Sequence, residues 1–148
     1  MSSTHDFQLD PKLEQDSHFV QNWPLCQLRL INDQQYPWFL LVPRRKALRE
    51  YIDLSEQDAL QLQLESRRLS QWMLQKFQPT KLNIAALGNV VPQLHIHHIA
   101  RFTDDTAWPA PVWGYAPMLP YTEQEVQQKL FHWQQSLPVW PEVTLDRP

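Results

Sequence analysis

A long amphipathic helix between pairs of short apolar strands constrains the fold of this chain more than any other feature. Ser55 is a good N-cap, and Glu56 and Asp58 follow in the first turn, where the helix dipole favours negative charge. A mostly apolar stripe then recurs at spacings of three and four before Pro79, and its members are Ala59, Leu62, Ser66, Leu69, Met73 and Phe77. The sequence therefore predicts one long helix with a single buried face.

Two pairs of apolar segments flank this helix in the sequence. Residues 25–31 and 38–42 are joined by a short turn-forming stretch, and so are residues 82–87 and a histidine-rich segment after Pro92. Connections this short join antiparallel strands. We predict an α+β fold, in which an antiparallel sheet of about five strands is covered by the long helix.

The chain length of 148 residues suits one domain. We expect a single domain over residues 1–148, with a core at about residues 20–104 and a tail over residues 105–148. The tail is rich in proline and tryptophan, and its segment 108–120 is too proline-rich for a helix interior and too apolar to stay in water. We expect that segment to pack as extended chain against the body. Thr122 and Glu125 then form a capping box, which predicts a C-terminal helix of about twelve residues.

Composition and charge exclude several classes of protein. The net charge of −3 provides no basic field that would attract a nucleic-acid polymer. The longest nearly apolar run, residues 38–43, is far shorter than the roughly 20 residues of a membrane helix. A single cysteine, Cys26, and an amino terminus without signal-peptide character predict a cytoplasmic protein with no membrane partner.

Residues 93–101, Gln-Leu-His-Ile-His-His-Ile-Ala-Arg, contain the residues best suited to chemistry. Because side chains alternate in a strand, Gln93, His95 and His97 should share one face and His98 should lie on the other. Two histidines on one face suit nucleophilic or acid–base chemistry, metal binding, or a structural role. A metal strand of the cupin type would carry a carboxylate where Arg101 stands, and no other cluster has metal spacing, so we predict no metal site.

Several residues in this order resemble the histidine triad (HIT) superfamily. They are Pro43 at the end of an apolar strand, then Asn83, the pair Gly88-Asn89, the His95-x-His97 pattern and Arg101. The resemblance covers about residues 25–102, and the tail is similar to that of a bacterial branch of HIT family hydrolases. It implies a HIT-like fold, no cofactor, and a homodimer that pairs through the long helix and a sheet edge.

The resemblance also implies a reaction. The chain would be a nucleotide hydrolase or nucleotidyl transferase acting at the α-phosphate through a nucleotidyl-histidine intermediate. Its substrate would be a purine nucleoside phosphoramidate or a dinucleoside polyphosphate. The alternative is a catalytically weak nucleotide-binding module or sensor that retains the pocket.

The implied roles fall on specific residues of this sequence. His95 occupies the central position of the triad, that of the nucleophile, with one ring nitrogen free and the other bonded to a backbone carbonyl. His97 would donate a hydrogen bond to a phosphate oxygen or a proton to the leaving group. Gln93 occupies the first position in place of histidine, where its amide would contact the phosphate without shuttling a proton. The implied phosphate and ribose contacts are Gly88, Asn89, Val90, Asn83 and Asn32.

Two further departures from the family pattern concern the edges of the pocket. Trp38 stands where several relatives have a histidine in the second strand, and Lys46 stands where many have the histidine of a Pro-x-x-His turn. His98 occupies a normally apolar position on the opposite face, so we interpret it as structural. Trp108 and Trp113 are expected to pack the tail onto the sheet or a partner subunit rather than to line a base pocket.

Overall fold

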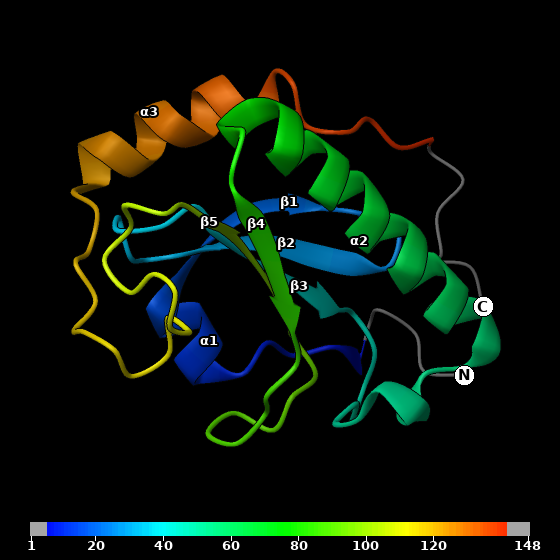
Figure 1. Cartoon of the computed structure of the whole chain (residues 1–148). Helices are drawn as coiled ribbons and strands as arrows, with labels where there is room; N and C mark the ends of the chain where they lie inside the picture. The colour runs from blue at the N-terminus through cyan, green and yellow to red at the C-terminus, as the bar shows by residue number, and fades with distance from the viewer. Residues whose placement is uncertain (1–5, 142–148) are drawn as a thin grey trace.

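The computed structural model describes residues 6–141, which form one antiparallel sheet with helices on both of its faces (Figure 1). The sheet order is β1-β2-β3-β5-β4, and every neighbouring pair is antiparallel. The strands are β1 (Ser17–Asn22), β2 (Cys26–Ile31), β3 (Trp38–Pro43), β4 (Lys81–Ala85) and β5 (Ile96–Arg101). The helices are α1 (Pro11–Asp16), α2 (Glu56–Phe77) and α3 (Glu123–Gln134). The predicted five-stranded α+β fold is thus confirmed.

Helices α2 and α3 begin where the sequence predicts. The Ser55 hydroxyl accepts the backbone N–H of Asp58, and the Thr122 hydroxyl accepts that of Glu125. Helix α2 ends at Phe77, and its C-cap Gln78 adopts a left-handed conformation, with a φ of 49°, just before a proline. No helix within residues 6–141 is long and apolar enough to cross a membrane.

Strand β1 has no counterpart among the predicted strands. It pairs with β2 at the edge of the sheet, and a bulge between Phe19 and Gln21 shifts its register. Phe19 is 48% exposed while Val20 is buried, so the apolar side chains of β1 do not all lie on one face of the strand. Because a bulge breaks the period of two, this strand lacks the alternation by which the others were predicted.

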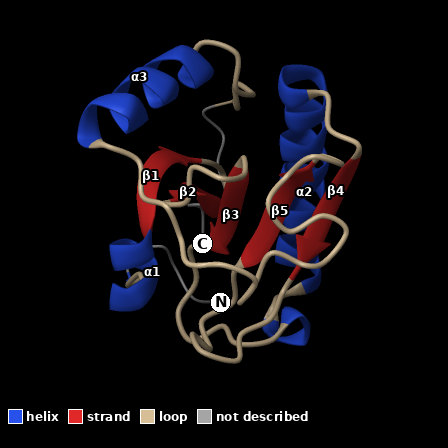
Figure 2. Ribbon diagram, turned by 60° about the vertical axis from the view of Figure 1, so that its left-hand side comes forward, coloured by secondary structure: helices blue, strands red, loops and turns tan. Residues whose placement is uncertain are grey.

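Two separate apolar cores lie on the two faces of the sheet. The helix-side core joins alternate strand residues such as Leu28, Phe39 and Ile96 to the inner faces of α2 and α3, which run over that face in Figure 1. The histidine-side core lies on the other face, where Figure 2 shows α1 and long irregular segments. Its buried members are Leu13, Ile31, Tyr36, Trp38, Leu40, Val42, Val91, Ile99, Ala107 and Val112.

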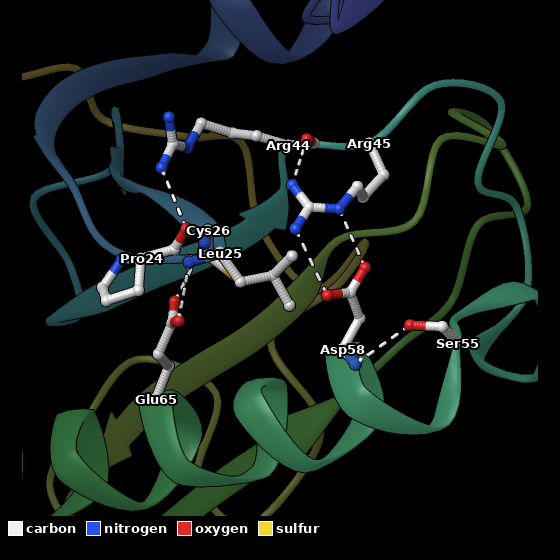
Figure 3. Close-up of polar contacts among 8 residues, drawn as sticks. All are labelled: Pro24, Leu25, Cys26, Arg44, Arg45, Ser55, Asp58 and Glu65. Carbon is white, nitrogen blue, oxygen red and sulfur yellow. Dashed lines mark hydrogen bonds and ion pairs between the residues drawn. The ribbon is translucent and has the colours of Figure 1, made fainter. Parts of the chain in front are cut away.

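Buried carboxylates on α2 connect this helix to the strand ends, as Figure 3 shows. Glu65 is fully buried, and its two oxygens accept the backbone N–H groups of Leu25 and Cys26 at 2.8 and 2.9 Å. Asp58 binds the Arg45 guanidinium at 2.8 and 3.2 Å. These bonds fix the position of α2 against the sheet.

Replacing Glu65 by alanine should lower the free energy of unfolding by about 2–6 kcal/mol, because two buried backbone N–H groups would lose their acceptors at roughly 1–3 kcal/mol each. Urea denaturation measures this loss. Gln63→Ala, at an exposed position of the same helix, is the matched control and should change stability by no more than about 0.5 kcal/mol. Equal losses in the two variants would contradict the assignment.

Candidate functional site

Strand β5 lies between β3 and β4 and carries the histidines. It begins at Ile96, later than the strand predicted after Pro92, because the backbone N–H of Leu94 bonds to the carbonyl of Leu48 instead of to a neighbouring strand. The predicted alternation of faces is nevertheless present. Leu94, Ile96 and Ala100 belong to the helix-side core, and Ile99 belongs to the histidine-side core.

The His95 ring is held by a local backbone acceptor. Its Nδ1 lies 2.6 Å from the carbonyl oxygen of Gln93, and because a carbonyl can only accept, Nδ1 carries the proton. In the neutral ring the Nε2 lone pair is then unprotonated, and Nε2 has no hydrogen-bond partner within residues 6–141. His95 is 7% exposed.

His97 has the opposite tautomer. The indole Nε1 of Trp38 lies 2.9 Å from Nδ1 of His97, and because an indole N–H can only donate, Nδ1 is the unprotonated acceptor. Burial, together with the nearby His95 and His98 rings, lowers the pKa of His97 to about 3. His97 is therefore neutral at pH 7, and its single ring proton is on Nε2.

The His95 and His97 rings are neighbours in an edge-type arrangement. The centroids of His95 and His97 are 5.0 Å apart, with an interplanar angle of 66°. One ring has an unprotonated Nε2, and the other has an Nε2–H donor. This pair combines an unprotonated ring nitrogen with a neutral hydrogen-bond donor.

His98 lies on the other face, as predicted. It is fully buried, with Nδ1 3.1 Å from the carbonyl of Ile96 and Nε2 2.8 Å from the hydroxyl of Ser66 on α2. The carbonyl fixes the proton on Nδ1, so Nε2 accepts from the serine. Burial lowers its pKa to about 4. His98 therefore joins the sheet to α2 and has no access to the histidine-side face.

The Gln93 side chain binds the N-terminal segment. Its Oε1 accepts the backbone N–H of Asp10 at 2.8 Å, and its Nε2 donates to the carbonyl of Gln8 at 2.9 Å. One amide hydrogen remains for a ligand. The residues that it joins are more than 80 positions apart in the sequence, so no local pattern could reveal this contact.

Asn83 and Asn32 are also bonded to other parts of the chain. The Oδ1 of Asn83 accepts from Arg101 at 2.8 Å, and Arg101 forms a buried ion pair with Asp105 at 2.8 Å. The Oδ1 of Asn32 accepts the backbone N–H of Tyr121 in the tail at 3.0 Å. The sequence reasoning did not single out Asp105, although its carboxylate holds the start of the tail.

The loop with Gly88, Asn89 and Val90 starts close to the histidines. Ala85, at the end of β4, pairs with His97, and Gly88 follows three positions later with a φ of 76°. Asn89 is exposed and Val90 is 77% exposed, so this loop presents its surface to solvent.

The tail packs against the body, as its composition predicted, and covers part of the histidine-side face. The expected extended conformation is wrong for residues 108–116, which are mostly turns and bends. Ala107 and Val112 are buried in the histidine-side core. The Trp113 ring lies 5.1 Å from His97 and 6.1 Å from Trp38, measured between centroids. Trp108 lies beside Arg101, with the guanidinium carbon 5.7 Å from its ring centroid.

A polar cavity of about 410 Å³ adjoins Gln93. Lys46 is exposed and lines this cavity together with Gln93. The cavity is lined by Asp6, Gln8, Arg45, Lys46, Ala47 and Gln93. Among residues 6–141, no group of three or more His, Cys, Asp or Glu side chains is arranged to hold a metal ion.

Comparison with known proteins places this arrangement in a family. The HIT domain model matches residues 12–104. A histidine triad protein from Marinobacter aquaeolei is 44% identical, with a TM-score of 0.86 over 88% of this chain and 96% of its own. Another from Bradyrhizobium japonicum is 43% identical, with a TM-score of 0.86 over 90% and 99%.

More distant structures share the fold alone. A protein from Sulfolobus tokodaii described as a hypothetical histidine triad nucleotide-binding protein is 18% identical, with a TM-score of 0.57 over 80% of this chain and 83% of its own. A search of curated proteins finds no match. The family model and the relatives above 40% identity decide the assignment: the chain belongs to the histidine triad family.

Proposed function

We propose that the chain is a nucleotide hydrolase or nucleotidyl transferase that acts at an α-phosphate through a nucleotidyl-His95 intermediate. The observation that supports this most strongly is the pair of complementary tautomers. The carbonyl of Gln93 keeps the proton of His95 on Nδ1, so Nε2 has a lone pair for attack. The neighbouring His97 ring, with its centroid 5.0 Å from that of His95, has an Nε2–H donor.

In the first step, Nε2 of His95 forms a bond to the α-phosphorus while the P–N or P–O bond to the leaving group breaks. The leaving group takes the bonding electrons and a proton from solvent. In the second step, water attacks the phosphorus, loses its proton, and releases the nucleoside monophosphate and neutral His95. The Gln93 carbonyl accepts from Nδ1–H throughout and stabilises the charge on the phosphorylated ring.

Donors around the phosphate complete the site. We assign His97 to a non-bridging phosphate oxygen, together with the remaining amide hydrogen of Gln93. The backbone N–H groups of the Gly88, Asn89 and Val90 loop and the Asn89 side chain are further donors, favoured by their exposure beside the end of β4. Asn83 would donate a hydrogen bond from its side-chain NH₂ group to the phosphate or the ribose. Asn32 could contact the ribose through its Oδ1 only if its hydrogen bond to the Tyr121 backbone N–H broke.

Family membership supports a nucleotide substrate. We assign a purine nucleoside phosphoramidate or a dinucleoside polyphosphate, with no cofactor. A homodimer is part of the proposal, because exposed Leu60, Leu64 and Leu74 of α2 lie on the same side of the sheet as exposed Ile84 of the edge strand β4. A monomer in analytical ultracentrifugation would exclude that pairing.

One observation favours a second candidate function, a nucleotide-binding module with slow turnover. Gln93 cannot carry a proton, and two of its hydrogen-bonding groups are used by Gln8 and Asp10. A pocket of this kind would bind a nucleotide through His95 and His97 while releasing the leaving group slowly. Binding and turnover measured on one preparation distinguish the two functions.

Mass spectrometry of the protein mixed with adenosine phosphoramidate or diadenosine polyphosphate tests the proposed intermediate. After rapid acid quenching, we expect a mass increase of one nucleotidyl group on the peptide that contains His95. Adenosine is the matched control, because it has no phosphorus and can form no adduct. An adduct on another residue, or hydrolysis with no adduct at any quench time, would contradict the His95 assignment.

A further inference from the structure

The family pattern supplies no function for Trp38, which stands where several relatives have a histidine. Trp38 lies at the start of β3 opposite Ile99, while its neighbour on the same face, Leu40, pairs with His97. Side chains at such diagonal positions are within reach of one another when one is aromatic. The indole thereby crosses to His97, and Trp38 is only 3% exposed.

The bond between these two rings has one possible direction. The Trp38 indole has a single polar group, an N–H donor, and it lies 2.9 Å from Nδ1 of His97. A proton on Nδ1 would place two hydrogens between the nitrogens. The His97 ring is therefore restricted to the tautomer with its proton on Nε2, and a second proton could bind only after this hydrogen bond broke.

We propose that Trp38 is a positioning residue that fixes His97 as a neutral Nε2–H donor to a non-bridging phosphate oxygen. This inference rests on the proposed function. It also decides between the two roles that the sequence left open for His97, a hydrogen bond to a phosphate oxygen and a proton transfer to the leaving group. A neutral imidazole that donated its remaining proton to a leaving group would become an imidazolate, so His97 donates a hydrogen bond and the leaving group takes its proton elsewhere.

Trp113 provides a matched control within the same aromatic cluster. Its ring contacts both Trp38 and His97 at centroid distances of 6.1 and 5.1 Å. Its own Nε1, however, is buried without a hydrogen-bond partner within residues 6–141. Trp113 thus contributes packing to the His97 ring but no proton-directing bond.

Nitrogen-15 NMR of the wild-type chain tests the bond without any substitution. We expect a pyrrole-type signal for Nε2 of His97, a pyridine-type signal for Nδ1, and a coupling across the N–H···N bond between Trp38 Nε1 and His97 Nδ1. A pyrrole-type Nδ1 at neutral pH would overturn the inference. This measurement does not depend on turnover, so it remains decisive if a Trp38 variant fails to fold.

Trp38→Phe and Trp113→Phe then separate tautomer control from packing. In Trp38→Phe, the His97 signals should move toward a mixture of tautomers, and kcat for a nucleotide substrate should fall about tenfold with little change in KM, as expected when one hydrogen bond to an acting group is lost. Trp113→Phe should leave the tautomer unchanged. Unchanged His97 signals or an unchanged kcat in Trp38→Phe would overturn the positioning role of Trp38 but not the proposed function. A wild-type chain without turnover would overturn the proposed function as well.

Discussion

Replacing His95 by alanine is expected to lower the rate of nucleotide cleavage at least about 10³-fold and to abolish the nucleotidyl adduct. The reason is that, in the proposed mechanism, the unprotonated Nε2 of His95 attacks the phosphorus, while His97 is held as a hydrogen-bond donor. Loss of a covalent nucleophile removes the whole two-step route rather than one stabilising contact. Steady-state kinetics with adenosine phosphoramidate and diadenosine polyphosphate measure the effect.

Nucleotide affinity should survive the same substitution. Isothermal titration calorimetry of His95→Ala should give a dissociation constant within about tenfold of the wild-type value, since one hydrogen bond is worth about 1 kcal/mol. His132→Ala, at an exposed position of α3, is the control and should retain full activity. Cleavage by His95→Ala at the wild-type rate would exclude His95 as the nucleophile. Tight nucleotide binding with no wild-type turnover would favour the binding module.

The second large effect is a loss of stability in mild acid. His97 and His98 have pKa values lowered mainly by burial to about 3 and about 4, from an ordinary value of 6.5. Below pH 6.5 the unfolded chain binds protons that the folded chain excludes, so the free energy of unfolding falls as pH falls toward these values. Each group contributes up to about 1.4 kcal/mol per pH unit, giving a combined slope of up to about 2.8 kcal/mol per unit between pH 6 and 4.

Urea denaturation at a series of pH values measures this slope. His98→Gln is the informative variant, because glutamine keeps a donor for Ile96 and an acceptor for Ser66 but does not titrate, and it should roughly halve the slope. Burial raises the pKa of Glu65, so that group has the opposite sign and stabilises the fold as pH falls. A free energy of unfolding that stays constant from pH 6.5 to 4.5 would contradict the burial of both imidazoles as neutral rings.

Local patterns predicted most of the fold. The helix from Glu56 to Phe77 and the two hairpins follow from periods of 3.6 and two residues, which depend only on neighbours in sequence. The faces of the histidine segment follow from the same alternation, so His95 and His97 were separated correctly from His98. Strand β1 was missed because its bulge removes the alternation and its pairing with β2 decides its conformation.

The identity of the site residues and the geometry of the site have different origins. The sequence alone determined which residues share a face of the sheet. Gln93, His95 and His97 lie two positions apart in one short segment, and side chains at that spacing point to the same face. The sequence also predicted that a backbone carbonyl holds His95, and the acceptor is that of Gln93, only two residues away. Both features depend only on residues close together in the sequence, so no tertiary structure is needed to predict them.

Only the tertiary structure decided what each group can do. Trp38 bonds His97 across 59 positions of sequence, and Gln93 bonds Asp10 across 83. Spacing cannot predict these contacts, because they depend on strand order and on how the N-terminal segment and the tail cover the histidine-side face. The sequence thus determined the fold class and the candidate nucleophile. The packing of distant segments determined the protonation of His97 and the use of Gln93, because tautomers and hydrogen-bond partners are set by whichever donors and acceptors the folded chain brings within about 3 Å.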